Sequence, residues 1–225
     1  MIKNFRNKKQ NLITIIGIGG GSQNIVNYLN ERIENINFIS INSDEQVLNL
    51  AETKALLLTD KKAFLLNKNK FLLFWKNLFN KVFAKKQSLG CGGDINRGKY
   101  LAEKHVKKIS KIARFADSKV VILVSTFGGG FGTGVTPVIA KHLKTLNINT
   151  IAIITLPFSF EGKTRKMTAQ KGIDELIPYV QNCIVLDNEK LTHNMPANIT
   201  TKEMFNSINE VFYTNILQVI SNGGI

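Results

Sequence analysis

Cysteine is scarce in this sequence: Cys91 and Cys183 are the only two in 225 residues, and they lie far apart. Neither forms a C-x-x-C pair or has a histidine at ligand spacing, which argues against a disulfide framework and a zinc site. We therefore expect two reduced thiols in a cytoplasmic protein, and we predict no metal ligands. Long apolar runs are missing too, because the stretch LITIIGIGGG soon breaks into glycines and predicts no signal peptide.

Acidic residues are also few, with sixteen Asp and Glu against thirty Lys and Arg and a net charge of +14. Such an excess favours a polyanion as partner: nucleotide phosphates, nucleic acid or an anionic membrane surface. Asn, Lys and Ile are abundant throughout, so a compositional bias spread over solvated faces also explains the charge. Basicity alone selects no partner, and we expect no specific nucleic acid.

Apolar patterning predicts one globular α/β domain over residues 1–225. Short β-branched and apolar runs predict strands at 12–16, 37–42, 55–58, 119–125, 150–156 and 183–186. Helical spacing predicts helices after the first glycines and at 99–114, 135–146, 161–176 and 201–221. Continuous apolar strands that alternate with helices indicate a parallel sheet covered on both faces, a Rossmann-like three-layer fold.

Polar and glycine-rich segments follow the strands, at 17–24, 42–44, 127–134, 157–165 and 187–190. In parallel sheets, ligands bind at the carboxyl ends of the strands. We therefore expect these segments to converge on one rim of the molecule.

The first glycine-rich segment, GIGGGSQN, partly matches the dinucleotide fingerprint G-x-G-x-x-G. Gly17 and Gly19 fit, and Asp44 supplies an acidic residue at the end of the second strand. Ser22 stands where the third glycine belongs, so a nicotinamide or flavin site is only a weak alternative.

The second segment, FGGGFGTGVTP, places five glycines in the seven positions 128–134. Glycine within a structural element costs about 0.5–1 kcal/mol relative to alanine, so this density needs a physical reason. Close packing of a helix on a strand would explain one such turn. Two of them on one rim favour backbone N–H groups that bind phosphate oxygens at helix N-termini.

The same segments resemble FtsZ, the bacterial relative of tubulin, whose signature GGGTGTG is matched by residues 128–134. The resemblance runs from about residue 12 to the C-terminus. It rests on segments that agree in order with the family's nucleotide loops and the entry to its central helix: GIGGGSQN, INSDEQVL, FGGGFGTGVTPVIAK, LPFSFEGKTRKMTAQKGIDEL, DNEKL and FNSINEVF. It implies the tubulin/FtsZ nucleotide-binding domain, ending in a long central helix.

The resemblance also implies a site for GTP or GDP, with Mg²⁺ left open and no catalytic residue assigned. Backbone donors of 20–24 and 130–134, with the Thr133 hydroxyl, would hold the phosphates, and Glu161 and Arg165 would contact ribose and phosphates. Alone, that last pair would be an ordinary i, i+4 salt bridge. The full set of expected nucleotide contacts is Gly19, Gly20, Gly21, Ser22, Gln23, Asn24, Asn42, Asp44, Gly129, Gly130, Phe131, Gly132, Thr133, Gly134, Glu161, Arg165, Asn188, Phe205 and Glu210.

Recognition of the base would fall to Asn188, Phe205 and Glu210. Phe205 can stack on guanine, and the Glu210 carboxylate can accept from N1–H and the exocyclic amino group, a pattern that favours guanine over adenine. The family usually has aspartate at this position, so the carboxylate is kept and its reach grows by one methylene. Outside this context, Phe205 would be an ordinary core residue.

The sequence departs from the family pattern in two ways that bear on GTP hydrolysis. Phe131 replaces the first signature threonine with a bulky ring, which puts the phosphate geometry in doubt. The chain then stops at SNGGI, before the acidic loop and second domain that follow the family's central helix. We therefore expect no self-stimulated hydrolysis, while hydrolysis with an FtsZ-like partner stays open.

A third departure is an insertion at about 61–87, where FLLFWKNLFNKVFAKK predicts a basic amphipathic helix. Such a helix at 71–86 binds an anionic membrane interface, docks on a partner or packs on its own domain. We expect an FtsZ-like guanine-nucleotide-binding protein of the cell-division or cytoskeletal type, with self-association or an FtsZ-like partner. The alternative is a membrane- or partner-binding module that has lost nucleotide.

Overall fold

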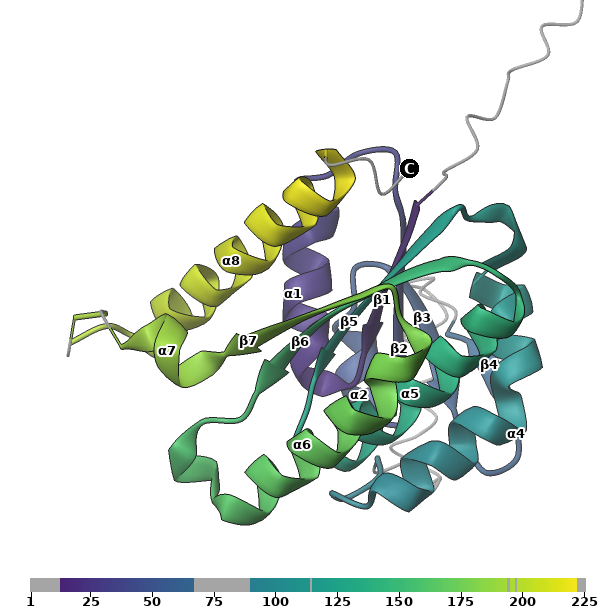
Figure 1. The fold of residues 1–225 in the computed structure, drawn as a ribbon, viewed down its shortest axis with the longest axis horizontal. Helices are drawn as coiled ribbons and strands as arrows, with labels where there is room; N and C mark the ends of the chain where they lie inside the picture. The colour runs from purple at the N-terminus through teal and green to yellow at the C-terminus, as the bar shows by residue number, and fades with distance from the viewer. Residues whose placement is uncertain (1–12, 67–89, 114, 194, 197, 222–225) are drawn as a thin grey trace, which may run out of the picture.

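The computed structural model describes residues 13–66, 90–113, 115–193, 195–196 and 198–221. Within them, the centre of the molecule is a seven-stranded sheet with the order β4-β3-β2-β1-β5-β6-β7 (Figure 1). Six strands are parallel, and β4 pairs antiparallel with β3. The strands are β1 (Ile13–Ile18), β2 (Asn37–Asn42), β3 (Lys54–Leu58), β4 (Ala63–Leu65), β5 (Val120–Thr126), β6 (Asn149–Leu156) and β7 (Asn182–Asp187).

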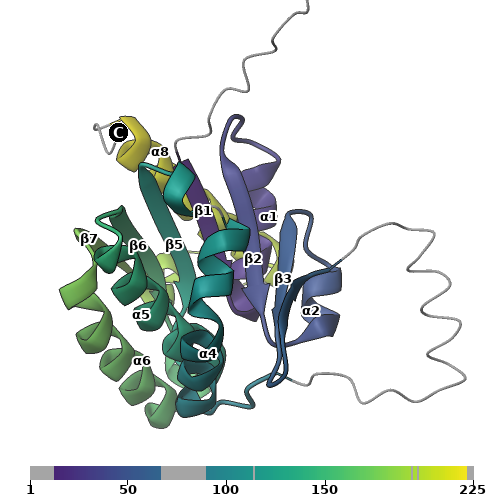
Figure 2. The same cartoon turned by 90° about the vertical axis from the view of Figure 1, so that its right-hand side faces the viewer.

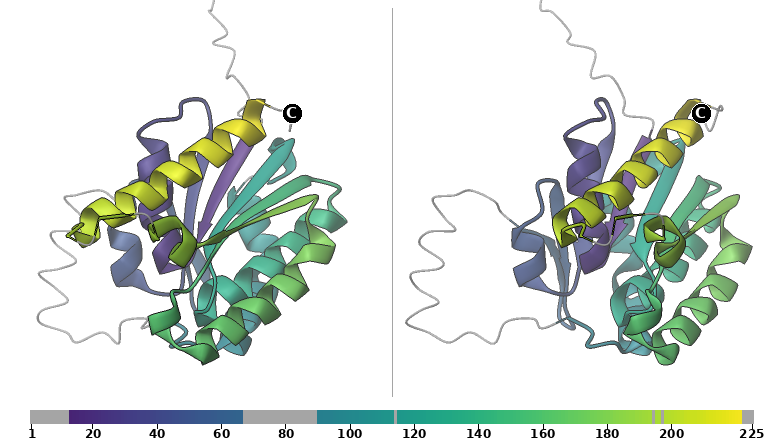
Figure 3. Two further views of the ribbon diagram at one scale, coloured as in Figure 1. Left: turned by 60° about the vertical axis from the view of Figure 1, so that its left-hand side comes forward. Right: turned by 90° about the vertical axis from the view of Figure 1, so that its left-hand side faces the viewer.

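Helices cover both faces of this sheet (Figures 2 and 3). One layer consists of α4 (Ile95–Ala113), α5 (Gly130–Thr145) and α6 (Lys163–Leu176). The other contains α1 (Gly20–Asn30), α2 (Glu45–Asn49), α7 (Asn188–Thr192) and α8 (Thr201–Ser221). Short 3-10 turns lie at η1 (Phe115–Asp117), η2 (Ser159–Glu161) and η3 (Ile177–Tyr179). None of the helices in the described part of the chain has the length and apolar character that crossing a membrane requires.

Two large hydrophobic cores follow from the period-two alternation of the strands. On β1, Ile16 and Ile18 face the core beneath α4 and α5, while Ile13 and Ile15 face the core beneath α1 and α8. Because both faces are covered, the strands read as continuous apolar runs rather than as alternating ones. The three-layer α/β fold expected from the sequence is thus confirmed.

The strand order creates a switch point between β1 and β5, which pair in parallel at the centre of the sheet. The connection after β1 runs through α1 on one face, and the connection after β5 runs through α5 on the other. In open α/β sheets, ligands bind in the crevice at such a point, beyond the carboxyl ends of the strands.

Some local expectations differ from the structure, and one is not tested by it. Helix α5 begins at Gly130 instead of residue 135, so most of the second glycine segment is helical and Pro137 lies inside the helix. The expected insertion begins with β4, a strand that the sequence analysis did not predict. The amphipathic helix expected at 71–86 lies outside the described residues.

Candidate functional site

Two helix N-termini meet at the switch point. Gly19 is the N-cap of α1 and Gly129 that of α5; neither helix has a side-chain cap or an acidic residue in its first turn. The first-turn N–H groups have no acceptor within their helices. A Cβ atom on Gly19 would lie only 3.4 Å from the amide nitrogen of Gly132. Since each N-terminus carries about half a positive charge, the pair favours an anion between them.

Hydrogen bonds fix both glycine segments to the sheet. The Gly19 N–H donates to the carbonyl of Ile41, and the Phe127 N–H donates to that of Thr155, both at 3.0 Å. Gly19 and Gly128 have φ of 94° and 103°, values that favour glycine. The donors of the two first turns are therefore held in place before any ligand arrives.

Close helix packing explains several glycines of the second segment. A Cβ on Gly130 would lie 2.5 Å from the amide nitrogen of Asp94, and one on Gly134 would lie 2.4 Å from the carbonyl oxygen of Ile95. Gly98 of α4 is equally close to α5, because a Cβ on it would lie 2.5 Å from the carbonyl oxygen of Gly130. Close packing of α4 on α5 therefore explains the glycines at these three positions. The sequence analysis had favoured phosphate binding over packing for the pair of segments.

Gly129 is different. Among the described residues, no atom outside its chain neighbours lies within 4 Å of the position that its Cβ would take, and its φ of −95° suits any residue. Neither packing nor backbone conformation accounts for a glycine at this N-cap. A group approaching the first turn of α5 from outside would need this space.

Phe131 lies in the first turn of α5, and its ring is buried in the core beneath α4 and α5. Its Cδ1 atom comes 4.0 Å from where a Cβ on Gly19 would stand, so the ring borders the meeting point of the two segments. Thr133 is fully buried, and its hydroxyl accepts a hydrogen bond from the Gly128 N–H at 2.9 Å. That hydroxyl shapes the loop, although its own proton is still available to donate.

The first turns of α1 carry three of the expected polar contacts. Ser22 is buried and its hydroxyl donates to the Gly19 carbonyl at 2.9 Å. Gln23 is only 2% exposed, and neither of its amide atoms has a hydrogen-bond partner among the described residues. Asn24 is exposed. A buried amide without partners is costly, so Gln23 is a polar group that a ligand or water could satisfy.

Asn42 and Asp44 end β2 beside α1. The Asn42 Oδ1 atom accepts from the Ser43 N–H at 2.8 Å, and its Nδ2 lies 4.0 Å from where a Cβ on Gly20 would stand. Asp44 caps α2, where its Oδ1 accepts from Gln46 and Val47. Asn42 thus faces the first turn of α1, whereas the Asp44 carboxylate already has a structural role.

The expected pair of Glu161 and Arg165 is formed: Glu161 Oε2 accepts from the guanidinium. A helix was expected at 161–176, which would contain both residues. Glu161 instead lies in η2, and α6 begins at Lys163, so the expected start of this helix is wrong. The other carboxylate oxygen accepts from the Phe158 N–H at 2.9 Å. Glu161 therefore both closes the η2 turn and positions Arg165 at the rim.

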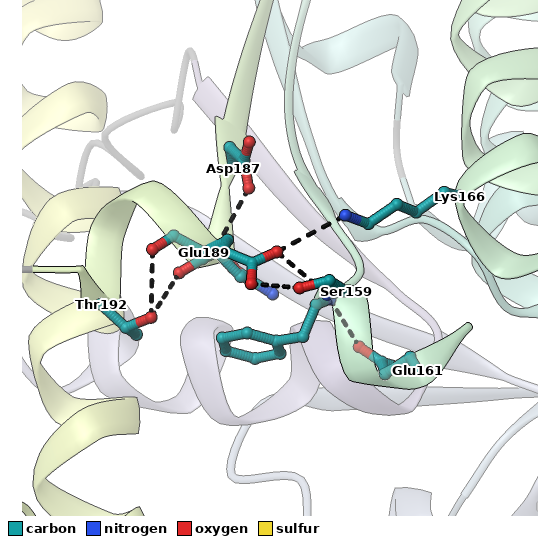
Figure 4. A network of polar contacts seen from close by, with 8 residues as sticks. Ser159, Glu161, Lys166, Asp187, Glu189 and Thr192 are labelled. Carbon is teal, nitrogen blue, oxygen red and sulfur yellow. Dashed lines mark hydrogen bonds and ion pairs between the residues drawn. The ribbon is translucent and has the colours of Figure 1, made fainter. Parts of the chain in front are cut away.

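A second polar network, which the sequence analysis missed, joins η2 to α7 (Figure 4). The Glu189 carboxylate accepts from the hydroxyl and N–H of Ser159, and Lys166 lies 3.5 Å away. The hydroxyl bond above all, together with the N–H and Lys166, holds the pKa of Glu189 below its ordinary value. No sequence pattern signals a contact between Ser159 and Glu189, which lie thirty positions apart in η2 and α7.

This network predicts a measurable pKa change. Replacing Ser159 with alanine removes the main cause of the lowered pKa, so the pKa of Glu189 should rise toward its ordinary value. In the parent, the bond is intact above the ordinary glutamate pKa and is lost as the pH falls through the lowered one. Carbon NMR of the carboxyl groups measures both values.

Glu203 provides an internal control for that titration. Its pKa is lowered by a hydrogen bond from the Thr200 hydroxyl, which is independent of Ser159. Its titration should be the same in both proteins. An unchanged Glu189 titration in the Ser159→Ala protein would contradict the assigned network.

The expected base contacts lie on α7 and α8. Asn188 begins α7, and its buried Oδ1 has no partner among the described residues. Phe205 is 44% exposed on α8. Glu210, also exposed, accepts a hydrogen bond from the hydroxyl of Tyr28 on α1. This hydrogen bond joins α8 to α1 near the expected base site.

Tyr28 should titrate abnormally because of that bond. The hydrogen bond to Glu210, and then burial, raise the pKa of Tyr28 above its ordinary value of 10.0. Replacing Glu210 with glutamine should return it toward that value, as measured by ultraviolet difference titration against Tyr28→Phe. A Tyr28 titration that is the same with either side chain would contradict the contact.

Two further polar residues were missed from the sequence. Thr126 ends β5 and touches both glycine segments: its Oγ1 lies 2.6 Å from a Cβ placed on Gly21, and its carbonyl oxygen 2.5 Å from one on Gly132. Asn209 is a buried amide next to Glu210. The motif FNSINE had drawn attention only to its first and last residues.

Comparison with known proteins gives a consistent result. The model of the "Tubulin/FtsZ family, GTPase domain" matches residues 12–196. Cell division protein FtsZ of Buchnera aphidicola subsp. Baizongia pistaciae is 33% identical over 218 residues, which are 95% of this chain and 50% of that protein. Mitochondrial division protein fszB of Dictyostelium discoideum is 30% identical over 213 residues, 92% of this chain and 51% of that protein. The chain spans about half the length of these relatives.

Solved structures agree with the fold. An empty FtsZ dimer from M. jannaschii has a TM-score of 0.72 and 30% identity, covering 91% of this chain and 52% of that one. A GTPγS-bound protofilament of CetZ2 from Haloferax volcanii has a TM-score of 0.75 at 18% identity, covering 94% and 58%. The second likeness supports the fold alone.

Proposed function

We infer that this chain, which belongs to the Tubulin/FtsZ family, binds GTP or GDP at the switch point between β1 and β5. The observation that carries the proposal is the meeting of two uncapped helix N-termini, with open space in front of Gly129. Phosphate oxygens are the natural partners of such donors. Sheets with this kind of switch point also bind dinucleotides in other proteins. The family membership, and not the strand order, is therefore the reason for proposing a guanine nucleotide.

The residues present fit this nucleotide. First-turn N–H groups of α1 and α5 would receive the phosphates, including that of Phe131, whose backbone donor is independent of its side chain. Gln23 and Asn188 have buried amide atoms without partners, which nucleotide groups or bridging water would satisfy. Arg165 would add charge at the phosphates, and Phe205 and Glu210 would stack on and hydrogen-bond the guanine.

Nucleotide extraction tests the proposal directly. Protein purified in magnesium buffer and denatured should release GDP or GTP, identified by chromatography, at close to one equivalent. Release of a nicotinamide or flavin would favour the dinucleotide alternative. Release of no nucleotide, together with no uptake of added GDP, would refute the proposal.

A division or cytoskeletal role is the second part of the proposal. Relatives are named as cell division proteins, and a structural neighbour with 30% identity is an FtsZ dimer. We propose that this chain associates with itself or with an FtsZ-like partner. The residues 71–86 lie outside the described part of the chain, so their membrane or partner contact remains a prediction.

For the 225-residue polypeptide alone, we predict GTP binding without self-stimulated hydrolysis. The described part of the rim offers backbone donors and the side chains of Glu161, Arg165 and Glu210. We assign all of these groups to binding and orienting the nucleotide. Phosphate release should therefore not rise with protein concentration, because no subunit activates the next. Adding a full-length FtsZ tests completion by a partner, and concentration-dependent turnover of this chain alone would contradict the prediction.

A further inference from the structure

The two helical layers differ sharply in charge. Helices α4, α5 and α6 together carry twelve Lys and Arg against three Asp and Glu. Helices α1, α2, α7 and α8 carry two against four. A compositional bias toward lysine would place a similar excess of basic residues in both layers. The asymmetry therefore indicates that one side of the molecule faces an anionic partner.

The excess concentrates in six exposed lysines, which we call the lysine face: Lys104, Lys107, Lys108, Lys111, Lys141 and Lys144. The four on α4 recur at helical spacing within about 10 Å of helix length. Burial first, and then the charge of Lys107 on α4, lower the pKa of His142 on α5. The acidic residues nearest in sequence to the α4 lysines are Glu103 and Asp117.

The lysine face lies away from the nucleotide rim. The first turns of α4 and α5 touch through Gly98, Gly130 and Gly134, and the two helices run in parallel from there. The lysines occupy the later turns, and α5 alone is about 24 Å long. Nucleotide phosphates bound at the N-termini would therefore lie away from these charges.

The side chains of the lysine face favour a plane of phosphates over a nucleic acid. They include no arginine for bidentate contacts with base edges. Two aromatic rings lie beside these lysines. Tyr100 is 49% exposed, and its hydroxyl accepts a hydrogen bond from Lys104 Nζ at 2.7 Å, while the half-buried Tyr179 has Lys144 Nζ 5.9 Å from its ring. Each ring thus already has a lysine against it, which leaves less of its face for stacking on bases. Flexible lysines on adjacent helices can reach the headgroups of a flat surface together.

We propose that the lysine face binds the phosphate headgroups of an anionic lipid bilayer. This contact involves none of the residues assigned to the nucleotide, so it would hold with or without GTP. Each lysine near such a surface strengthens binding about fivefold, and the attraction weakens with added salt.

The test is vesicle flotation with the full chain, comparing phosphatidylcholine vesicles with and without phosphatidylglycerol. Lys108→Gln with Lys111→Gln should weaken binding to the anionic vesicles about 25-fold. The matched control, Lys190→Gln with Lys202→Gln, removes two lysines from the other layer and should change it by less than about threefold. Circular dichroism should show both variants folded.

Equal binding by the two variants would overturn the proposal, because the residues 71–86 or the net charge would then suffice. So would binding to phosphatidylcholine alone that matches the anionic vesicles. Displacement from vesicles by a short DNA duplex at equal phosphate concentration would assign the face to nucleic acid instead.

Discussion

Replacing Gly129 with alanine is expected to weaken guanine-nucleotide binding at least tenfold while changing the free energy of unfolding by less than about 0.5 kcal/mol. The backbone at Gly129 suits alanine, and in the described part of the chain the added methyl meets no atom beyond its neighbouring residues within 4 Å. It does occupy the space in front of the first turn of α5. Calorimetric titration with GDP and chemical denaturation measure the two quantities.

Gly134→Ala is the matched control, with the opposite expected result. Its Cβ would lie 2.4 Å from the Ile95 carbonyl oxygen and 3.0 Å from the Lys99 amide nitrogen, both backbone atoms of α4. Separating α4 from α5 should cost about 3 kcal/mol of stability, well beyond the roughly 1 kcal/mol that alanine gains in helix propensity. If Gly129→Ala unfolds the protein, or leaves GDP affinity unchanged, Gly129 has no binding role.

Replacing Glu210 with glutamine should reduce GTP affinity about 10- to 150-fold and narrow the preference for GTP over ATP. A hydrogen bond to a charged group contributes about 1.5–3 kcal/mol, and the glutamine amide would turn a donor toward the donors of guanine. Glu210→Asp should keep most of the affinity, since it retains the carboxylate. Competition titrations with GTP and ATP provide both constants.

Glu203→Gln is the control for that substitution. Glu203 is an exposed carboxylate on the same helix, two turns earlier, and its hydrogen bonds go to Thr200. It should leave both affinities unchanged. An equal loss from both variants would mean that the charge of α8, and not a contact of Glu210 with the base, sets the affinity.

Most of the fold could be read from the sequence because its strands are long apolar runs and its last helix is strongly periodic. The bounds of α8 agree with the expected 201–221, and β2 with 37–42. The start of α5 could not be predicted, since glycine disfavours helices and only the contact with α4 overrides that preference. The strand β4 is three residues long and paired with one neighbour, too short for a pattern.

The candidate site was predictable as a rim but not as a set of contacts. Parallel topology alone brings the glycine segments together, and the structure places Gly19 against Gly132. Packing and binding glycines look the same in a sequence, so Gly129 could not be told from Gly130 or Gly134. The Glu189 and Tyr28 contacts join elements that are distant in sequence, and the hydroxyl of Thr133 proved to accept a hydrogen bond from Gly128 in the same glycine segment.

The central claim is that two helix N-termini form one guanine-nucleotide site, and calorimetric titration of nucleotide-free protein with GDP tests it most directly. We predict one site per chain with a Kd in the micromolar range or tighter, and much weaker binding of ADP. No heat of binding from folded protein in magnesium buffer, or equal affinity for ADP, would contradict the account.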